Sequence, residues 1–145
     1  MKLSTRGRYG ARVLLDLALQ EEGKPVPLKE IAKRQQISAL YIEQLITPLI
    51  AAGMIRSTRG AGGGIWLVKP ASEIKLSEII ELLEGPISPV HCVDNPNACS
   101  RSDLCVTRDV WIELKKSVSM VLESKTLQDL VEMQKRKKVP AKGLV

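Results

Sequence analysis

The sequence contains no phenylalanine, and its other aromatic residues are only two tryptophans and two tyrosines. Leucine, isoleucine and valine must therefore form most of the core. No stretch approaches the roughly 20 consecutive apolar residues that span a membrane, so we expect no membrane partner. The apolar run Leu14–Leu19 is interrupted by Asp16 and lacks a small-residue cleavage site, which argues against a secretory signal. We expect a cytoplasmic protein.

Histidine is almost missing as well. His91 is the only one, and the chain offers no convincing pair of nucleophile and base and no sign of a substrate-sized cleft. We therefore expect neither an enzyme nor a small-molecule substrate.

The charged residues are unevenly distributed. Residues 1–70 hold 11 Lys and Arg against 5 Asp and Glu, whereas residues 71–145 hold 11 of each. The formal net charge of +6 thus lies entirely in the first half, which predicts an anionic partner there. Charge alone does not separate nucleic acid from an acidic protein or a membrane surface, so the motifs must decide.

Apolar residues of the first half recur at helical spacing. Ser4 can cap a helix that runs to about Gln20, residues 28–35 form a short second helix, and Ser38 can cap a third that ends at Gly53. This order of helices is typical of a helix-turn-helix. Pro48 lies inside the third helix, where we expect a kink or a local break.

Two extended segments, Met54–Thr58 and Ile65–Val68, flank a glycine-rich tip at residues 59–64. They predict a hairpin, the wing of a winged helix, and Leu76–Glu84 predicts a further helix. The tip lacks the Gly-Lys-Ser/Thr ending of a nucleotide-binding P-loop. We therefore expect a mainly α fold with a small β wing: a winged helix-turn-helix domain at residues 1–85, joined to a long dimerisation helix.

The start of the third helix is the expected DNA-reading segment, because such a helix fits the major groove. Its serine and glutamine can bond base edges, and Tyr41 can either bond a phosphate or fill the core. Glu43 can accept a hydrogen bond from a cytosine amino group and so disfavour binding to sequences without that cytosine. Alternatively, Glu43 is simply solvated. The predicted contacts in this helix are Ser38, Ala39, Tyr41, Glu43 and Gln44.

Arginines accompany this segment. Arg59 at the tip can enter a narrow minor groove, and Arg56 and Gly60 lie beside it. Near the N-terminus, arginines are expected to contact phosphates, which position the protein without specifying sequence. These are Arg6, Arg8 and Arg12.

All three cysteines, Cys92, Cys99 and Cys105, lie within a proline-bearing loop at residues 86–107. An odd cysteine count in one short segment favours a metal or redox site over disulfides. The gaps of six and five residues are wider than those of zinc fingers and suit a multi-iron centre. His91 is a possible fourth ligand, as are an aspartate, a water, a small thiol or a group from a partner subunit.

Residues 108–134 are expected to hold the dimerisation helix and a C-terminal helix, followed by a basic flexible tail at 135–145. Thr126 and Asp129 predict the cap of the last helix, which should run from Leu127 to about Gln134. The long helix should start at Asp109 and carry a packing seam at 3-4-3 spacing. The seam residues, expected at the dimer interface, are Trp111, Leu114, Val118 and Val121.

Several segments together resemble the IscR-type iron–sulfur cluster regulators, a family of dimeric bacterial winged-helix repressors. The resemblance covers nearly the whole chain. Its segments are residues 1–10, Ile37-Ser38, Tyr41-Ile42-Glu43-Gln44-Leu45, Arg59-Gly60-Ala61-Gly62-Gly63-Gly64, Leu83-Glu84-Gly85-Pro86, residues 105–111 and Thr126-Leu127-Gln128-Asp129-Leu130.

The resemblance implies that the three cysteines hold an iron–sulfur cluster, that the long helix crosses to a second subunit, and that a homodimer binds a double-stranded DNA operator. A two-iron two-sulfur cluster is favoured and a four-iron four-sulfur cluster possible. In the member that gives the family its name, a histidine three residues after the last cysteine completes the cluster site, and this chain has Arg108 at that position. In a nitric-oxide-sensing relative, a partner-chain aspartate near the N-terminus completes the site, and the corresponding stretch of this chain offers Arg8. The alternatives are a thiol switch, a zinc site or control by a protein partner.

Overall fold

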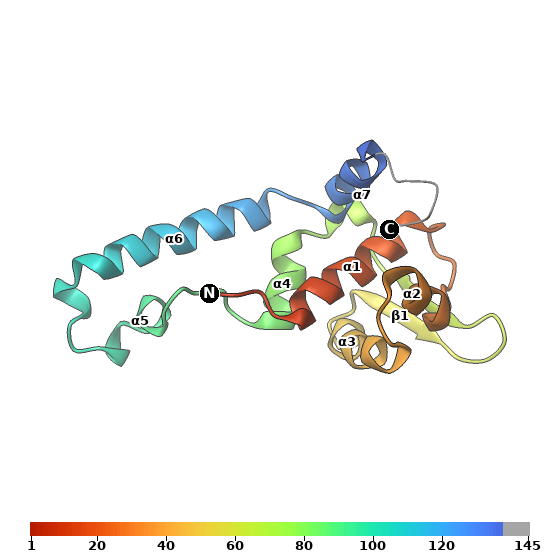
Figure 1. Cartoon of the computed structure of the whole chain (residues 1–145), viewed down its shortest axis with the longest axis horizontal. Helices are drawn as coiled ribbons and strands as arrows, with labels where there is room; N and C mark the ends of the chain where they lie inside the picture. The colour runs from red at the N-terminus through yellow and green to blue at the C-terminus, as the bar shows by residue number, and fades with distance from the viewer. Residues whose placement is uncertain (138–145) are drawn as a thin grey trace.

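The computed structural model describes residues 1–137 as seven α-helices, three short 3-10 helices and one two-stranded antiparallel sheet, with the long axis of the molecule running from wing to cysteine loop (Figure 1). The α-helices and strands are α1 Thr5–Leu19, α2 Leu28–Gln35, α3 Ala39–Ala51, β1 Ile55–Thr58, β2 Gly64–Leu67, α4 Leu76–Glu84, α5 His91–Asp94, α6 Val106–Glu123 and α7 Leu127–Arg136. The 3-10 helices are η1 Ala71–Glu73, η2 Pro96–Ala98 and η3 Ser102–Leu104. Within residues 1–137, no helix is long and apolar enough to cross a membrane.

Local signals place the helix-turn-helix. The Ser4 hydroxyl accepts from the Arg6 amide at 3.2 Å and starts α1, and the Ser38 hydroxyl accepts from the Tyr41 amide at 3.2 Å and starts α3. Gln36 adopts a left-handed conformation with φ 56°, which ends α2 and reverses the chain. The expected winged helix-turn-helix is confirmed, with its caps at the expected serines.

Pro48 does not interrupt α3, which is helical from Ala39 to Ala51. Pro48 cannot donate to the carbonyl of Gln44, yet the turn holds because Leu45 and Leu49 on either side are buried in the core. The expected local break is therefore absent.

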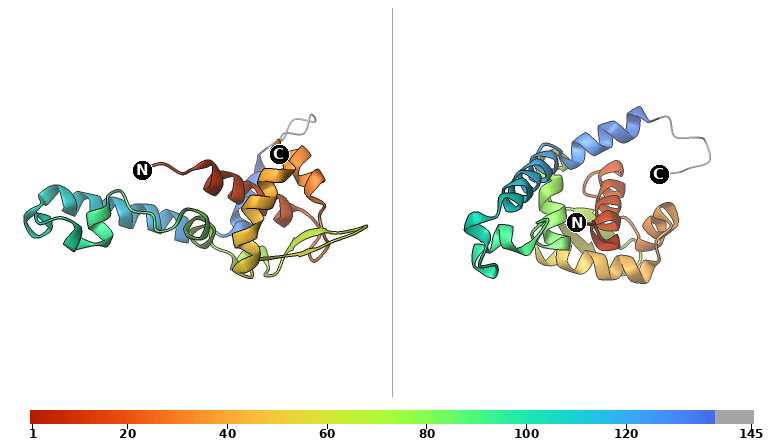
Figure 2. Two further views of the ribbon diagram at one scale, coloured as in Figure 1. Left: turned by 90° about the horizontal axis from the view of Figure 1, so that it is seen from below. Right: turned by 60° about the vertical axis from the view of Figure 1, so that its left-hand side comes forward.

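The wing is a hairpin in which Ile55 pairs with Leu67 and Thr58 with Gly64 (Figure 2). Gly64 also lies against the bridge between Val26 and Ile65: a Cβ there would come within 2.3 Å of the Val26 carbonyl. Only glycine permits this approach, so the segment before α2 packs directly on the wing.

The core lies between α1, α3, α4 and the hairpin, and consists of leucine, isoleucine, valine and Met54, as the lack of phenylalanine predicts. α7 returns to this body, where Leu127 and Val131 are buried and the backbone of Thr126 pairs with Lys75. α7 reaches Arg136, past the expected end at Gln134, so the expected tail 135–145 begins inside a helix. Its residues 138–145 lie outside the described part of the chain.

α6 lies beside α4 and extends away from the body, with α5 and the cysteine loop at its outer end (Figure 1). It begins at Val106, three residues before the expected Asp109, and none of its residues is buried. Leu114 is 38% and Val121 60% exposed. An arm of this kind has no core of its own.

Candidate DNA-binding face and cysteine loop

One face of α3 is open to solvent. Leu40, Glu43, Gln44 and Thr47 are all exposed and recur at helical spacing, so they form a single stripe, called the α3 stripe below. Two of the predicted contacts, Glu43 and Gln44, lie on it. Ala39 is half-buried, and the Ser38 hydroxyl is already an acceptor in the helix cap.

Tyr41 lies off the α3 stripe and packs towards the core. Its ring meets that of Tyr9 edge to face, with centroids 6.0 Å apart and planes at 84°. Of the two roles open to Tyr41 from the sequence, packing is therefore the one the geometry favours. Its neighbour Leu40, which sequence reasoning missed, takes the exposed place instead.

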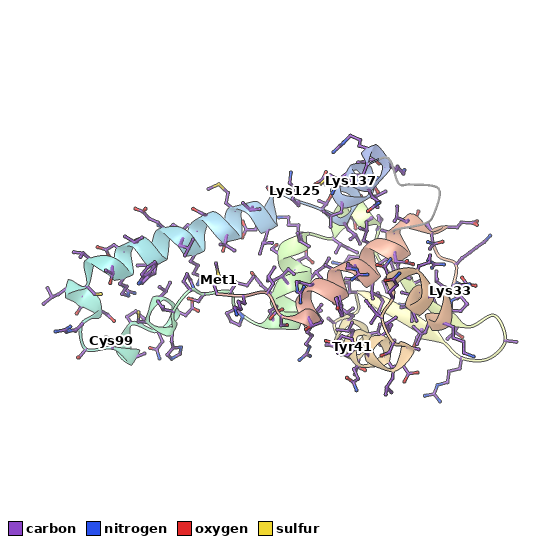
Figure 3. The ribbon with its side chains drawn as sticks, in the orientation of Figure 1. Met1, Lys33, Tyr41, Cys99, Lys125 and Lys137 are labelled. Atoms are coloured by element: carbon purple, nitrogen blue, oxygen red, sulfur yellow. The ribbon has the colours of Figure 1, made fainter. Side chains whose placement is uncertain are left out.

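Exposed arginines lie on two other elements, the wing and the start of α1. Arg56, Arg59 and Gly60 are exposed on the wing, and Arg6 and Arg8 at the start of α1. Gly60 has φ 91°, a conformation that glycine adopts without strain and that forms the tight tip. In Figure 3, Tyr41 and Lys33 lie in the body, at the opposite end of the molecule from Cys99.

A polar network that joins α1 to α2 was not predicted from the sequence. Asp16 is fully buried in α1 and accepts from Arg34 at 2.7 Å and from the Gln35 side chain at 2.9 Å. Gln35 in turn accepts from Arg12 through both its side-chain and backbone oxygens. Asp16 also raises the pKa of Arg34 by hydrogen bonding. Arg12, expected at a phosphate, is thus held in the turn between α2 and α3.

A second contact ties the N-terminus to α4. The Glu84 carboxylate accepts from the Ser4 amide at 2.8 Å, the Ser4 hydroxyl at 2.6 Å and the Gly7 amide at 3.1 Å. The Ser4 hydroxyl is the main cause of a lowered Glu84 pKa. The carboxylate therefore satisfies free amides at the start of α1.

The cysteines are free thiols that lie near one another in sequence but do not converge. Cys99 is exposed, Cys92 and Cys105 are half-buried, and none belongs to the core. Nowhere in residues 1–137 do three or more His, Cys, Asp or Glu side chains come together as a metal site. The Cys105 sulfur lies 3.1 Å from the Thr107 hydroxyl, which is the main cause of a lowered Cys105 pKa.

Hydrogen bonds to backbone carbonyls organise this loop. The buried Ser102 hydroxyl donates to the carbonyls of Pro96 at 2.7 Å and Cys99 at 2.9 Å. Arg108 donates from Nε to the Cys92 carbonyl at 3.0 Å, so the residue at the position of the IscR-type histidine supports the loop backbone. His91 is exposed at the start of α5.

Known proteins share this architecture. The profile of the Rrf2 family, described as an iron-dependent transcriptional regulator, matches residues 3–133. Protein rrf2 of Nitratidesulfovibrio vulgaris is 44% identical over 131 residues, which cover 90% of this chain and 87% of that protein. The structure of CymR from B. subtilis, described as its global cysteine regulator, is 39% identical with a TM-score of 0.78 and covers 92% of this chain and 98% of its own. The structure of T. potens IscR is 38% identical, also with a TM-score of 0.78, over 97% of this chain and 93% of its own.

The winged helix-turn-helix and the relatives define a DNA-binding transcriptional regulator and not an enzyme. The chain belongs to the Rrf2 family, and the expected resemblance to its IscR-type members is confirmed.

Proposed function

We propose that this regulator is a homodimeric, cytoplasmic repressor that binds a two-fold symmetric operator and whose grip on DNA depends on an iron–sulfur cluster held by its three cysteines. The α3 stripe would read bases in the major groove through Glu43 and Gln44, and Arg59 would enter the minor groove. Arg6, Arg8 and Arg56 would neutralise phosphates. The exposure of all these side chains supports the assignment.

The donor set of the cysteine loop is the observation that carries the proposal. Cys92, Cys99 and Cys105 are free, lie outside the core and share one loop, and thiolates are the usual ligands of iron–sulfur clusters. The lowered pKa of Cys105 favours the thiolate that a metal needs. When bound, the cluster would supply a centre sensitive to oxygen, nitric oxide or iron shortage.

A continuous set of contacts joins this loop to the DNA-binding face. Arg108 connects α6 to the Cys92 carbonyl, α6 packs on α4, and Glu84 at the end of α4 holds the start of α1. From α1, Arg12 reaches the turn before α3 through Gln35. A change in the loop would therefore act on α3 through packed helices and not through a flexible linker.

The exposed apolar side of α6 supports the dimer. Trp111 and Leu114 are each more than a third exposed and Val121 more than half, although all three are apolar and follow one seam with Val118. Such a face is stable in water when a second copy covers it. The seam residues would therefore form the dimer interface.

Absorbance tests the cluster. Protein purified without oxygen should be brown, with iron and sulfide bound in similar amounts. The matched variant with Cys92, Cys99 and Cys105 all replaced by serine should be colourless, while its circular dichroism stays unchanged because none of the three lies in the core. A colourless native protein under these conditions would contradict the proposal.

A thiol switch is the second candidate, because the three sulfurs do not converge and one has a lowered pKa. Among the relatives, CymR of B. subtilis is described as a cysteine regulator, and an oxidised form of the Staphylococcus aureus CymR has been solved. A colourless protein whose DNA affinity changes on mild oxidation and recovers with dithiothreitol would favour this function. Stoichiometric zinc in a colourless protein would instead indicate a zinc site.

A further inference from the structure

The α3 stripe carries one apolar side chain, that of Leu40. Leu40 is 68% exposed and does not belong to the core or to the residues that pack against it. The nearby Ile42 is fully buried, so the opposite face of the helix packs into the core. Leu40 lies one turn before Glu43 and Gln44 on the same face, at the end of α3 that begins with the Ser38 cap.

The composition of α3 limits the kinds of base contact that the helix can make. Ala39–Ala51 contains neither lysine nor arginine, so the helix has no side chain for the bidentate guanine contact, which is the commonest specific contact to a base. Its exposed polar groups are a carboxylate, an amide and a hydroxyl. Sequence reading by α3 must therefore use these groups and apolar contact.

The major groove offers one apolar feature among the four bases, the 5-methyl group of thymine. A leucine has no donor or acceptor, so against any other base edge it would displace water from polar atoms without replacing their hydrogen bonds. A second copy of the chain is a less suitable occupant, because α4 packs against both α3 and α6 and so lies between the α3 stripe and the helix that carries the seam (Figure 2).

We propose that Leu40 reads a pyrimidine 5-methyl group and so selects thymine at one position of each half-site. The inference rests on the proposed function, in which the α3 stripe enters the major groove. Glu43 and Gln44, one turn further along the helix, would read the neighbouring base pairs.

Deoxyuridine tests this directly, because it differs from thymidine only by the missing methyl group. A duplex is first selected from a randomised library with the native protein, and each thymine is then replaced singly by deoxyuridine. We expect one position per half-site at which the replacement weakens binding about three- to fivefold, the effect of burying one methyl group. The Leu40→Ala variant should bind both duplexes equally, and Leu40→Met should retain the preference.

Further outcomes are decisive. If native protein and Leu40→Ala respond alike to every deoxyuridine, the inference is wrong. If 5-methylcytosine in place of cytosine tightens binding while deoxyuridine has no effect, the assignment to thymine is overturned. If neither Leu40→Ala nor Gln44→Ala changes the sequence preference, α3 does not read DNA and the proposed function itself fails. If Gln44→Ala changes the preference and Leu40→Ala does not, only the role of Leu40 is refuted. Leu40 is exposed, so urea unfolding should confirm that its variants are as stable as the native protein.

Discussion

At the residue scale, Gly10 determines how closely α1 approaches α4. A Cβ at this position would lie 2.1 Å from the Leu83 methyl carbon Cδ1, well inside van der Waals contact. Gly7, one turn earlier, is similarly close to the Glu84 side chain. Each glycine lowers the intrinsic stability of the α1 helix, but together they allow the close packing of α1 on α4.

We expect Gly10→Ala to destabilise the protein, although alanine is normally about 1 kcal/mol better in a helix. Overpacking against Leu83 should cost about 1–3 kcal/mol, measured as a lower midpoint of urea unfolding. In a Leu83→Ala background the same substitution should be neutral or stabilising, because the clash is gone. Stabilisation in the native background would show that α1 and α4 are not packed as described.

Local contacts of single residues were predictable from the sequence, whereas contacts between distant residues were not. Ser4, Ser38 and Thr126 were predictable caps because their hydrogen bonds lie within three residues of themselves. Asp16 and Arg34 were not predictable as a pair, because they lie 18 positions apart in the sequence and only the packing of α1 on α2 joins them. Leu40, and not Tyr41, lies on the exposed stripe. Apolar periodicity alone does not decide which of two adjacent residues of a helix faces the solvent.

At the element scale, the α1–α2 contact through Arg12 positions α3. Arg12 lies beneath the Tyr9 ring, with its guanidinium carbon 5.2 Å from the centroid, and bonds Gln35 just before the left-handed Gln36. The guanidinium carbon of Arg8 also lies near this ring, 5.8 Å from the centroid. Arg8 is exposed, however, and its side chain has no hydrogen bond or ion pair among the described residues. The two arginines therefore have different expected roles.

Salt dependence separates these roles. Arg8→Ala should lower the slope of log affinity against log salt by about 0.9, the value for one lost phosphate contact, and Arg8→Lys should restore it. Arg12→Ala should weaken binding while the slope stays native, and Arg12→Lys should not restore binding because lysine lacks the planar fork. A reduced slope in Arg12→Ala that lysine restores would identify Arg12 as a phosphate contact instead.

The contact between Glu84 and the start of α1 should depend on pH. Its carboxylate pKa is lowered in the folded protein, chiefly by the Ser4 hydroxyl, so its stabilisation is complete above the unfolded pKa of about 4.3 and is lost as the pH falls through the folded pKa. Glu84→Gln should therefore unfold more easily than the native protein at pH 7. The difference should vanish in acid, as followed by urea titrations across pH. A difference independent of pH would exclude the carboxylate as its cause.

At the scale of the whole molecule, the winged-helix body and the cysteine loop lie at opposite ends of the long axis, with α6 between them (Figure 1). The body was largely predictable, because apolar periodicity and caps determine it locally. The return of α7 to the core depends on Leu127, which is buried and whose amide donates to the carbonyl of Ile74, a residue distant in sequence. The cysteine loop was the least predictable part, because its sequence has no apolar periodicity. No sequence motif indicates that the Ser102 hydroxyl donates to a backbone carbonyl of the loop.

The exposed seam of α6 makes oligomeric state testable. Leu114→Asp should convert the dimer to a monomer in sedimentation equilibrium, because a charge on an apolar interface is left without a partner. Lys116→Glu lies on the opposite face of the same helix and should leave the dimer intact. Dissociation by both variants, or by neither, would contradict an interface along the seam.

Control of DNA binding by the cysteine loop is the central claim, and one comparison tests it most directly. Affinity for the library-selected duplex is measured without oxygen at one fixed salt concentration, for cluster-loaded protein and for the same protein after the cluster is removed. The two dissociation constants should differ by about 5- to 150-fold, the usual range of coupling between two sites. Equal constants would contradict the claim.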